Sequence, residues 1–227
     1  MPIESITQRG VYSTDRASAL AGVPRSTAYY WARTGLLTPS VSPERVKLWS
    51  WSDLVALRAV YWLRHPAESE GRDPTSMRRV QRLVDVVKRE AGRLGDVIAD
   101  GSVELRVDIS GTPFVDVNGY MIEDSTRWAQ LVGRPLVVDL LATFSVDEHL
   151  VGPNLRHPRA HLRIIPGKLS GEPHVEGSRV ETRVLASLAH RGLSARDLAD
   201  LYSDLPVVAI EDALDLERQL ESNLRAA

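Results

Sequence analysis

Residues 12–39 read YSTDRASALAGVPRSTAYYWARTGLLTP and set the fold of the N-terminal part of the chain. Ser13 or Thr14 can cap a first helix, because a side-chain oxygen there can accept an unpaired backbone N–H. Gly22 supplies a tight turn. Pro24 fits the first position of a second helix, where the missing N–H costs little. The stretch therefore predicts two short helices joined by a turn.

The second predicted helix opens with cationic and hydroxyl side chains and runs to Gly35. A helix N-terminus carries partial positive charge and free N–H groups, both of which suit phosphate. We expect this helix to enter a DNA groove, as the second helix of a helix-turn-helix does. The residues expected to contact DNA from it are Arg25, Ser26, Thr27, Tyr29, Tyr30 and Arg33.

A short β-hairpin, or wing, is predicted in residues 36–51, which read LLTPSVSPERVKLWSW. The alternation in its second half is typical of a strand. Arg45 and Lys47 would occupy exposed positions and approach the flanking minor groove. The Ser-Asp pair at 52–53 is expected to cap a further helix, residues 54–63.

This order of elements resembles the MerR family of winged-helix transcription factors over about the first 65 residues. The residues that carry the resemblance are Tyr12, Ala19, Gly22, Val23, Ser26, Thr27, Tyr30, Trp31, Gly35, Leu36, Leu37 and Pro39. It implies binding to double-stranded promoter DNA, which a helix-turn-helix protein is expected to contact as a two-fold homodimer. MerR proteins usually continue into a dimerising coiled coil and a ligand site, whereas no sustained heptad repeat follows here.

Charge is distributed unevenly along the chain. Residues 1–95 hold 15 Lys and Arg against 9 Asp and Glu, residues 96–163 hold 6 against 10, and residues 164–227 hold 7 against 11. The first segment therefore carries +6 and each of the others −4, which gives the net charge of −2. A basic module joined to acidic modules is typical of a protein that binds DNA at one end and another partner elsewhere.

Composition excludes several classes of protein. There is no cysteine, so disulfides, thiolate metal sites and cysteine nucleophiles are excluded. No apolar run approaches the ~20 residues of a membrane helix, and the N-terminal MPIESITQRG lacks the pattern of a signal peptide. We expect a cytoplasmic protein without membrane contact, and the 227 residues suit two or three small domains.

The middle of the chain is predicted to hold a half-buried β-hairpin. Residues 103–117 alternate apolar and polar side chains around Gly111, whereas the apolar run at residues 136–144 could be strand or helix. We therefore expect a mainly α fold with small β elements (α+β). The expected domains are a MerR-like winged helix at 1–95, a small α+β connector or partner-binding region at 96–163, and a third domain at 164–227.

A second recognisable pattern lies near the C-terminus. Ser194 is expected to cap a helix, with Asp197 three residues later as its capping-box partner. Residues 171–179 (GEPHVEGSR), residues 192–198 (GLSARDL) and Tyr202 resemble the DUF433 family, whose pattern is G-x-P-x-I-x-G-T-R followed by G-x-S/T-x-E-E-I/L. Ser178 replaces the usual Thr and keeps the hydroxyl. The loop residues carried over from the family are Gly177, Ser178 and Arg179.

A MerR-like head joined to a DUF433 tail resembles non-standard VapB-type antitoxins. The resemblance implies a protein that represses its own promoter and sequesters a PIN-like ribonuclease toxin of the VapC type. Such a nuclease holds divalent metal with clustered carboxylates, among which an antitoxin can insert a cation. The candidate cations are Arg156, Arg159, Arg163, Lys168 and Arg225.

The last predicted helix, residues 210–220, is acidic, and like charge beside phosphate is repulsive. We therefore expect the C-terminal domain to serve dimerisation or toxin contact. Two alternatives remain open. The chain could be a free-standing MerR-like regulator whose residues 96–163 bind a small molecule, or a protein-interaction scaffold whose helix-turn-helix is vestigial.

Catalytic motifs are absent from the sequence. His157 and His161 have a spacing that could suit a metal on one helical face, but Pro158 lies between them and no HExxH pattern is present, so a loop is expected. GxSxG, a P-loop and a strand-linked GxGxxG are also missing. We expect no enzymatic activity, no cofactor and no metal.

Overall fold

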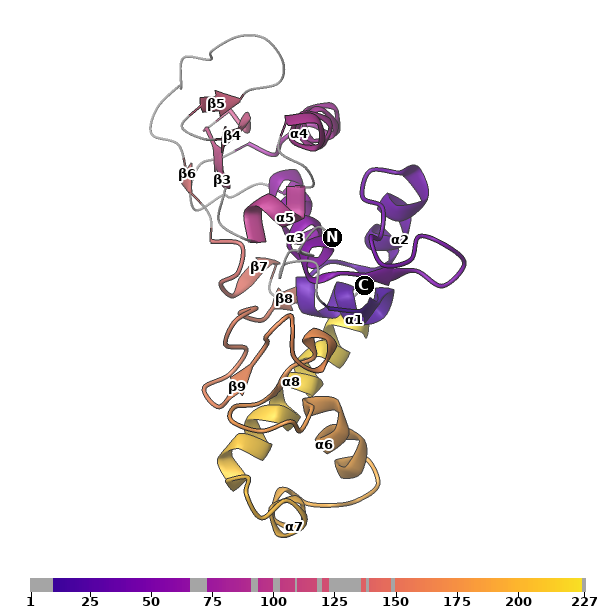
Figure 1. Cartoon of the computed structure of the whole chain (residues 1–227), viewed down its shortest axis with the longest axis vertical. Coiled ribbons are helices and arrows are strands. Elements are labelled where there is room, and N and C mark those ends of the chain that lie inside the picture. Colours follow the sequence, from indigo (N-terminus) through magenta and orange to yellow (C-terminus); the bar gives the residue numbers. More distant parts are fainter. Residues whose placement is uncertain are drawn as a thin grey trace, which may run out of the picture.

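The computed structural model describes residues 10–65, 73–90, 94–99, 103–108, 110–117, 120–122, 136–137, 139–147 and 150–225. Within these residues the fold is mainly helical with small antiparallel sheets, as the sequence predicts. The molecule is elongated, and its C-terminal helices form the end opposite to the central sheet (Figure 1). None of the described helices combines the length and the apolar character needed to cross a membrane.

The two predicted N-terminal helices are present as α1 (Thr14–Ala21) and α2 (Arg25–Thr34). α1 begins after Ser13, whose Oγ accepts a hydrogen bond from the backbone N–H of Arg16 at 3.2 Å. Gly22 ends α1 with φ +68°, and a Cβ at this position would lie 2.5 Å from the backbone nitrogen of Gly152. The turn therefore requires glycine both for its left-handed backbone and for its close packing.

The predicted β-hairpin after α2 is wrong in its extent. Strand β2 (Leu48–Trp49) pairs with β1 (Tyr12–Ser13) instead of with a neighbouring strand of its own hairpin. Ser42 and Leu48 form an isolated bridge through backbone hydrogen bonds of 3.1 and 2.9 Å. Pro43 follows the bridge and has no N–H for a longer ladder. The segment is therefore a closed loop, residues 42–48, and not a two-stranded wing.

Helix α3 (Trp51–Arg64) is the centre of the N-terminal core. Ser50 caps it and forms a capping box with Asp53, so the helix begins earlier than the sequence pattern predicts. Arg58 in its middle is fully buried, and burial lowers the pKa of its guanidinium to about 9. This side chain donates hydrogen bonds to the carbonyls of Leu20, Ala21, Leu140, Ala142 and Pro153. Arg58 thereby joins the end of α1 to the middle of the chain.

The middle of the chain holds α4 (Met77–Glu90), α5 (Leu94–Ala99) and a four-stranded antiparallel sheet of order β5-β4-β3-β6. The strands are β3 (Val103–Val107), β4 (Pro113–Val117), β5 (Tyr120–Ile122) and β6 (Leu136–Val137). β3 and β4 confirm the predicted hairpin of residues 103–117. Residues 136–144 are not one element, because β6 and the start of β7 (Phe144–Asp147) both fall within them. β7 pairs with β8 (Leu150–Gly152).

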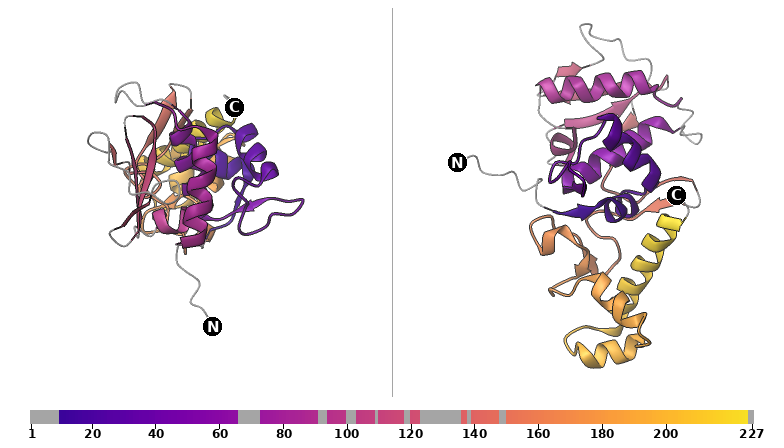
Figure 2. Two further views of the ribbon diagram at one scale, coloured as in Figure 1. Left: turned by 90° about the horizontal axis from the view of Figure 1, so that it is seen from above. Right: turned by 90° about the vertical axis from the view of Figure 1, so that its right-hand side faces the viewer.

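The C-terminal elements are β9 (Leu162–Arg163), the 3-10 turn η3 (Leu169–Gly171), β10 (His174–Val175), α6 (Thr182–Ala189), α7 (Ala195–Leu201) and α8 (Val207–Arg225). Ser194 caps α7 in the predicted capping box with Asp197. α8 is longer than predicted and runs from the tip of the molecule back to α1 and β8 (Figure 2). There Asn223 donates hydrogen bonds to the carbonyls of Ala19 and Val151 at 2.9 and 2.8 Å.

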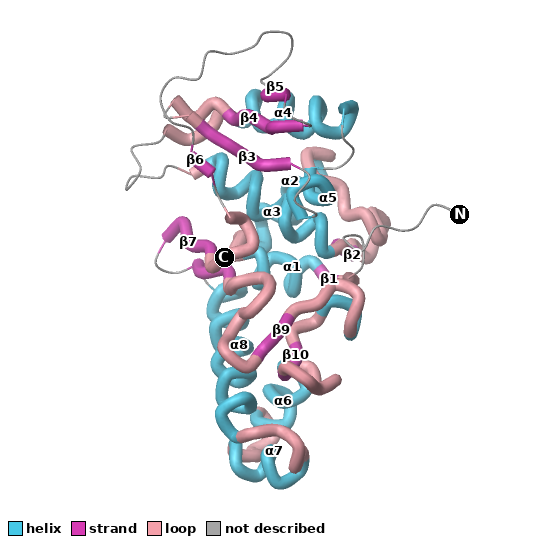
Figure 3. The backbone as a smooth tube through the Cα atoms, turned by 60° about the vertical axis from the view of Figure 1, so that its left-hand side comes forward, coloured by secondary structure: helices cyan, strands magenta, loops and turns pink. Residues whose placement is uncertain are grey.

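A buried ionic cluster, which we call the seam, joins α1 to the C-terminal elements and consists of Arg16, Glu172, Thr182 and Glu217. Arg16 donates to both carboxylate oxygens of Glu217 at 2.8 Å and to Glu172 at 2.9 Å. The hydroxyl of Thr182 also donates to Glu217. Figure 3 shows α1 between α3 and α8, and one hydrophobic core includes residues of all three helices. Packing is therefore continuous from the N-terminal helices into the DUF433-like segment.

Candidate nucleic-acid interface

Helix α2 presents a polar face to solvent because its apolar face is buried. Ala28 is fully buried and Trp31 is 3% exposed, and both pack into the core. This packing turns the neighbouring side chains outward, so that Tyr29 is 47% exposed and Tyr30 is 50% exposed. Two adjacent tyrosines with this exposure are accessible to a partner.

The exposed face of α2 contains most of the side chains predicted for DNA contact. It consists of Arg25, Ser26, Tyr29, Tyr30 and Arg33, whereas Thr27 is half-buried. The Arg33 guanidinium lies 5.9 Å from the centre of the Tyr30 ring, within the range of a cation–π contact. Arg25 lies 3.6 Å from Asp15, and because both side chains are about half exposed, water screens this pair.

The N-terminus of α2 is open to an anion. Pro24 occupies the cap position without a side-chain hydrogen bond, and the first turn contains no acidic residue. The backbone N–H groups of this turn therefore keep their capacity to bind a negatively charged oxygen. Arg25 and Ser26 stand at the same end of the helix.

The loop of residues 42–48 lies beside α2. Lys47 Nζ donates to the carbonyls of Pro43 at 3.0 Å and Glu44 at 3.4 Å, which fixes the lysine on its own loop. Lys47 lines a surface hollow of about 340 Å³ together with Ser26, Tyr29, Tyr30 and Arg33. Arg45 is exposed on the same loop. The fold thus brings Lys47 to the face of α2 although the predicted hairpin is replaced by a closed loop.

Two of the five cations expected to contact a toxin tie elements of this chain together. Arg159 donates to Asp215 at 2.8 Å, which fastens the segment before β9 to α8 and lowers the pKa of that carboxyl. Arg163 forms an ion pair with Glu176 at 2.6 Å beside β10. Both arginines are about three-quarters buried. Their contacts are therefore those of structural ties.

The other three expected cations lie nearer to solvent. Arg156 pairs with Asp139 at 3.5 Å and Arg225 pairs with Glu221 at 3.1 Å, and all four side chains are substantially exposed. Such pairs are weak and exchange readily. Lys168 is half-buried just before η3. The five cations therefore do not form one exposed cationic patch.

The loop of Gly177, Ser178 and Arg179 lies between β10 and α6. Gly177 has φ +76°, a conformation that favours glycine. Ser178 Oγ donates to the carbonyl of Val175 at 3.0 Å and accepts from the N–H of Val180 at 3.1 Å. A hydroxyl closes this loop, which explains why Ser can stand where the family pattern has Thr.

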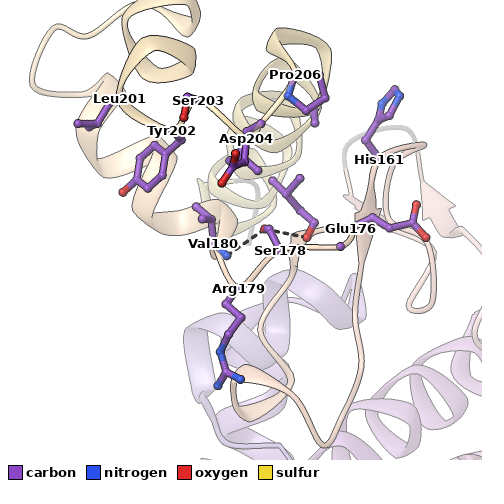
Figure 4. Close-up of a pocket in the computed structure, with 14 residues that line it drawn as sticks. His161, Glu176, Ser178, Arg179, Val180, Leu201, Tyr202, Ser203, Asp204 and Pro206 are labelled. Atoms are coloured by element: carbon purple, nitrogen blue, oxygen red, sulfur yellow. Dashed lines mark hydrogen bonds between the residues drawn. The ribbon is translucent and has the colours of Figure 1, made fainter.

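This loop and the turn at residues 201–206 enclose an open groove of about 680 Å³, which we call the tip groove (Figure 4). Its lining combines side chains of the loop, of the turn and of the first part of α8. His161 stands at its edge, and its Nδ1 lies 2.8 Å from Asp212 Oδ2. His157 belongs to a separate turn, in which its backbone N–H donates to Asn154 Oδ1 at 2.8 Å. Among the described residues, no group of three or more His, Asp or Glu side chains is placed to hold a metal ion.

Sequence reasoning did not find the seam or the role of Arg58. The available signal was a charged residue on an otherwise apolar helix face. Glu217 lies on α8 among Ala213, Leu216 and Leu220, which are almost fully buried. A carboxylate at such a position needs a buried cation or hydroxyl as partner, and this requirement would have directed attention to Arg16.

Comparison with known proteins identifies the C-terminal part of the chain. Residues 163–215 match the family described as "Protein of unknown function (DUF433)", so the predicted DUF433 domain is present. This range runs from β9 into α8 and includes most of the tip groove. A search of the curated proteins finds no match.

A solved structure is similar in fold. The X-ray crystal structure of Rv2018 from Mycobacterium tuberculosis aligns with a TM-score of 0.52, covering 90% of this chain and 96% of that chain at 17% identity. At this identity the likeness concerns the fold alone.

Proposed function

We propose that the chain is a DNA-binding antitoxin that represses its own operon and neutralises a PIN-like ribonuclease of the VapC type. The observation that carries the proposal is the exposed face of α2, where four residues predicted for DNA contact line one hollow together with Lys47: Ser26, Tyr29, Tyr30 and Arg33. The DUF433 domain supplies the second part, because its combination with a MerR-like head resembles VapB-type antitoxins.

Physical chemistry supports DNA as the partner of the α2 face. The open N-terminus of α2 suits one phosphate, and Arg33 and Lys47 suit the phosphates on either side. Arg25 has the length and the donors to reach a guanine edge in the major groove. Residues 1–95 carry +6, which favours the approach of a polyanion. A homodimer would place two α2 helices on an inverted repeat.

A gel-shift titration of the upstream promoter fragment tests the DNA part of the proposal. The logarithm of the association constant should fall linearly with the logarithm of the salt concentration. Arg33→Ala should weaken binding, whereas Arg196→Ala, an exposed arginine of α7 at the far tip, should not. Absence of binding at low salt would refute the repressor role. The antitoxin part predicts that the neighbouring open reading frame encodes a PIN-like chain, and co-purification of the two chains tests it.

A ligand-responsive regulator is the second candidate, and a hollow of about 450 Å³ behind α2 favours it. The hollow is lined by residues 35–40 and by residues of α3, α4 and α5. Its volume lies within the usual range for small-ligand sites. None of its lining residues falls within residues 96–163, the region expected to bind the ligand. This reading requires a small molecule that changes DNA affinity, and tight binding of the nuclease without such a molecule would count against it.

A further inference from the structure

The tip groove combines an apolar floor with an exposed apolar rim. Val175, Leu205 and Ala209 line it and are at most 7% exposed. At the rim Leu201 is 59% exposed. A large exposed aliphatic side chain beside a hollow with an apolar floor favours contact with another molecule.

The walls of the tip groove are fixed before anything binds. Ser178 closes one wall through its two hydrogen bonds. The opposite wall is a turn in which the N–H of Leu205 donates to the carbonyl of Tyr202 at 2.8 Å. Tyr202 and Asp204 project from this wall, while Arg179 points away from it (Figure 4). A preformed groove loses little conformational entropy when a partner enters it.

Two exposed carboxylates line the tip groove, whereas the lining arginine, Arg179, points away from the turn that carries Asp204. Asp204 is exposed at its rim, and Glu176 lines it with an exposed carboxylate that pairs with Arg163 on one side. Glu211 is exposed nearby on α8. The lining residue His161 is already bonded to an aspartate of α8. The exposed carboxylates of Asp204 and Glu176 therefore favour a cationic partner.

We propose that the tip groove docks a short amphipathic, basic segment of a partner protein. Apolar side chains of this segment would pack on Leu201 and the floor, and its Lys or Arg residues would face Asp204 and Glu176. The inference rests on the proposed function for the identity of the partner, and it places the docking face far from α2. DNA is a disfavoured occupant, because it brings negative charge against the acidic rim.

Fluorescence anisotropy with the full-length protein and two labelled peptides tests the proposal. Both peptides carry leucines at i, i+3 and i+4, and the remaining positions are lysine in one and glutamate in the other. The lysine peptide should bind about tenfold more tightly or better. Leu201→Ser should weaken that binding about tenfold, and Asp204→Lys should reduce the preference for lysine. Ile165→Ser and Glu221→Lys are matched controls outside the groove. They should change neither the affinity for the lysine peptide nor the preference for it over the glutamate peptide.

Three outcomes would overturn the proposal: no binding of the lysine peptide, equal binding of both peptides, or equal losses in the control variants. Sedimentation of the same variants identifies a competing occupant, because a dimer that dissociates in Leu201→Ser would assign the groove to a second copy. Promoter binding is measured in parallel. Leu201→Ser should leave it unchanged, so a failure of DNA binding and a failure of groove docking remain distinguishable.

Discussion

The α2 face and the seam use arginine in opposite ways. On α2, Arg33 stacks near a tyrosine in solvent and Arg25 has one water-screened contact with an aspartate. In the seam, Arg16 is largely buried and is held by two carboxylates within hydrogen-bonding distance. Burial alone would lower the pKa of its guanidinium, but the hydrogen bonds and charges of Glu217 and Glu172 outweigh burial and raise it above its ordinary value. An exposed arginine can exchange water for phosphate, whereas Arg16 cannot leave its carboxylates without leaving them buried and unpaired.

This difference shows that net charge by segment does not identify a binding surface. Arg16, Arg58, Arg25 and Arg33 all contribute equally to the positive charge of residues 1–95. Arg16 and Arg58 maintain the fold, and the α2 arginines face outward. Variants of the two regions should therefore separate stability from DNA affinity.

Glu217→Ala should have the largest effect. It leaves Arg16 buried with one carboxylate and removes one of the two acceptors of the Thr182 hydroxyl, which should lower the free energy of unfolding by about 3–5 kcal/mol. Urea denaturation measures the loss. Glu221→Ala, one turn later on α8 and 40% exposed, should cost about 0–1 kcal/mol. Equal losses in the two variants would show that the seam does not stabilise the fold.

Arg25→Ala should change DNA affinity and leave stability unchanged. If Arg25 reads a base, the variant should bind its operator more weakly by about 1–3 kcal/mol and should discriminate less at one base pair. Its unfolding transition should match that of the unaltered protein, because the side chain is exposed. A lower midpoint of the unfolding transition with normal DNA affinity would show that Arg25 stabilises the fold, as the seam does, and does not contact DNA.

Lys47→Ala should produce a smaller and less selective change. A lysine that contacts only phosphate should weaken all DNA sequences alike and reduce the slope of log K against log salt by about 1. Titrations of operator and unrelated DNA at several salt concentrations measure this. Loss confined to the operator would mean that Lys47 reads sequence.

The smallest expected effect concerns His174, next to the seam. Its side chain is 1% exposed and its Nδ1 lies 3.1 Å from the carbonyl of Glu172. Burial lowers the pKa of this imidazole below its ordinary value of about 6.5. The unfolded chain therefore binds a proton that the folded chain does not, and stability should fall as the pH drops below about 6.5. In His174→Leu, the free energy of unfolding should depend less steeply on pH below about 6.5. An unchanged dependence would mean that other groups cause the loss of stability.

Local signals in the sequence were sufficient for several elements. Ser13, Gly22 and Ser194 act through hydrogen bonds or backbone angles within a few residues, so their helix ends could be predicted. The loop of residues 42–48 could not, because the choice of β1 as the partner of β2 depends on a contact across the core. The seam depends on residues separated by up to 201 positions, which no local pattern encodes.

For the candidate site, the residues expected to contact DNA from α2 were chosen from the helix-turn-helix pattern, whereas the burial of Ala28 and Trp31, which turns both Tyr29 and Tyr30 outward, emerged only from the structure. The ion pairs of Arg159 and Arg163 could not be predicted from the sequence. Their carboxylate partners lie on α8 and just after β10, far along the chain or across a turn. Counting cations near a motif therefore overestimated how many are free to bind a partner.

A single introduced cysteine tests the central claim most directly, because the chain contains none. Ser26→Cys on α2 and Ser187→Cys on α6, both exposed, can each carry an iron chelate that cleaves nearby DNA. We predict cleavage of the promoter fragment within the operator from position 26 and none from position 187. Equal cleavage from both positions, or cleavage from position 187 alone, would contradict the assignment of the α2 face to DNA.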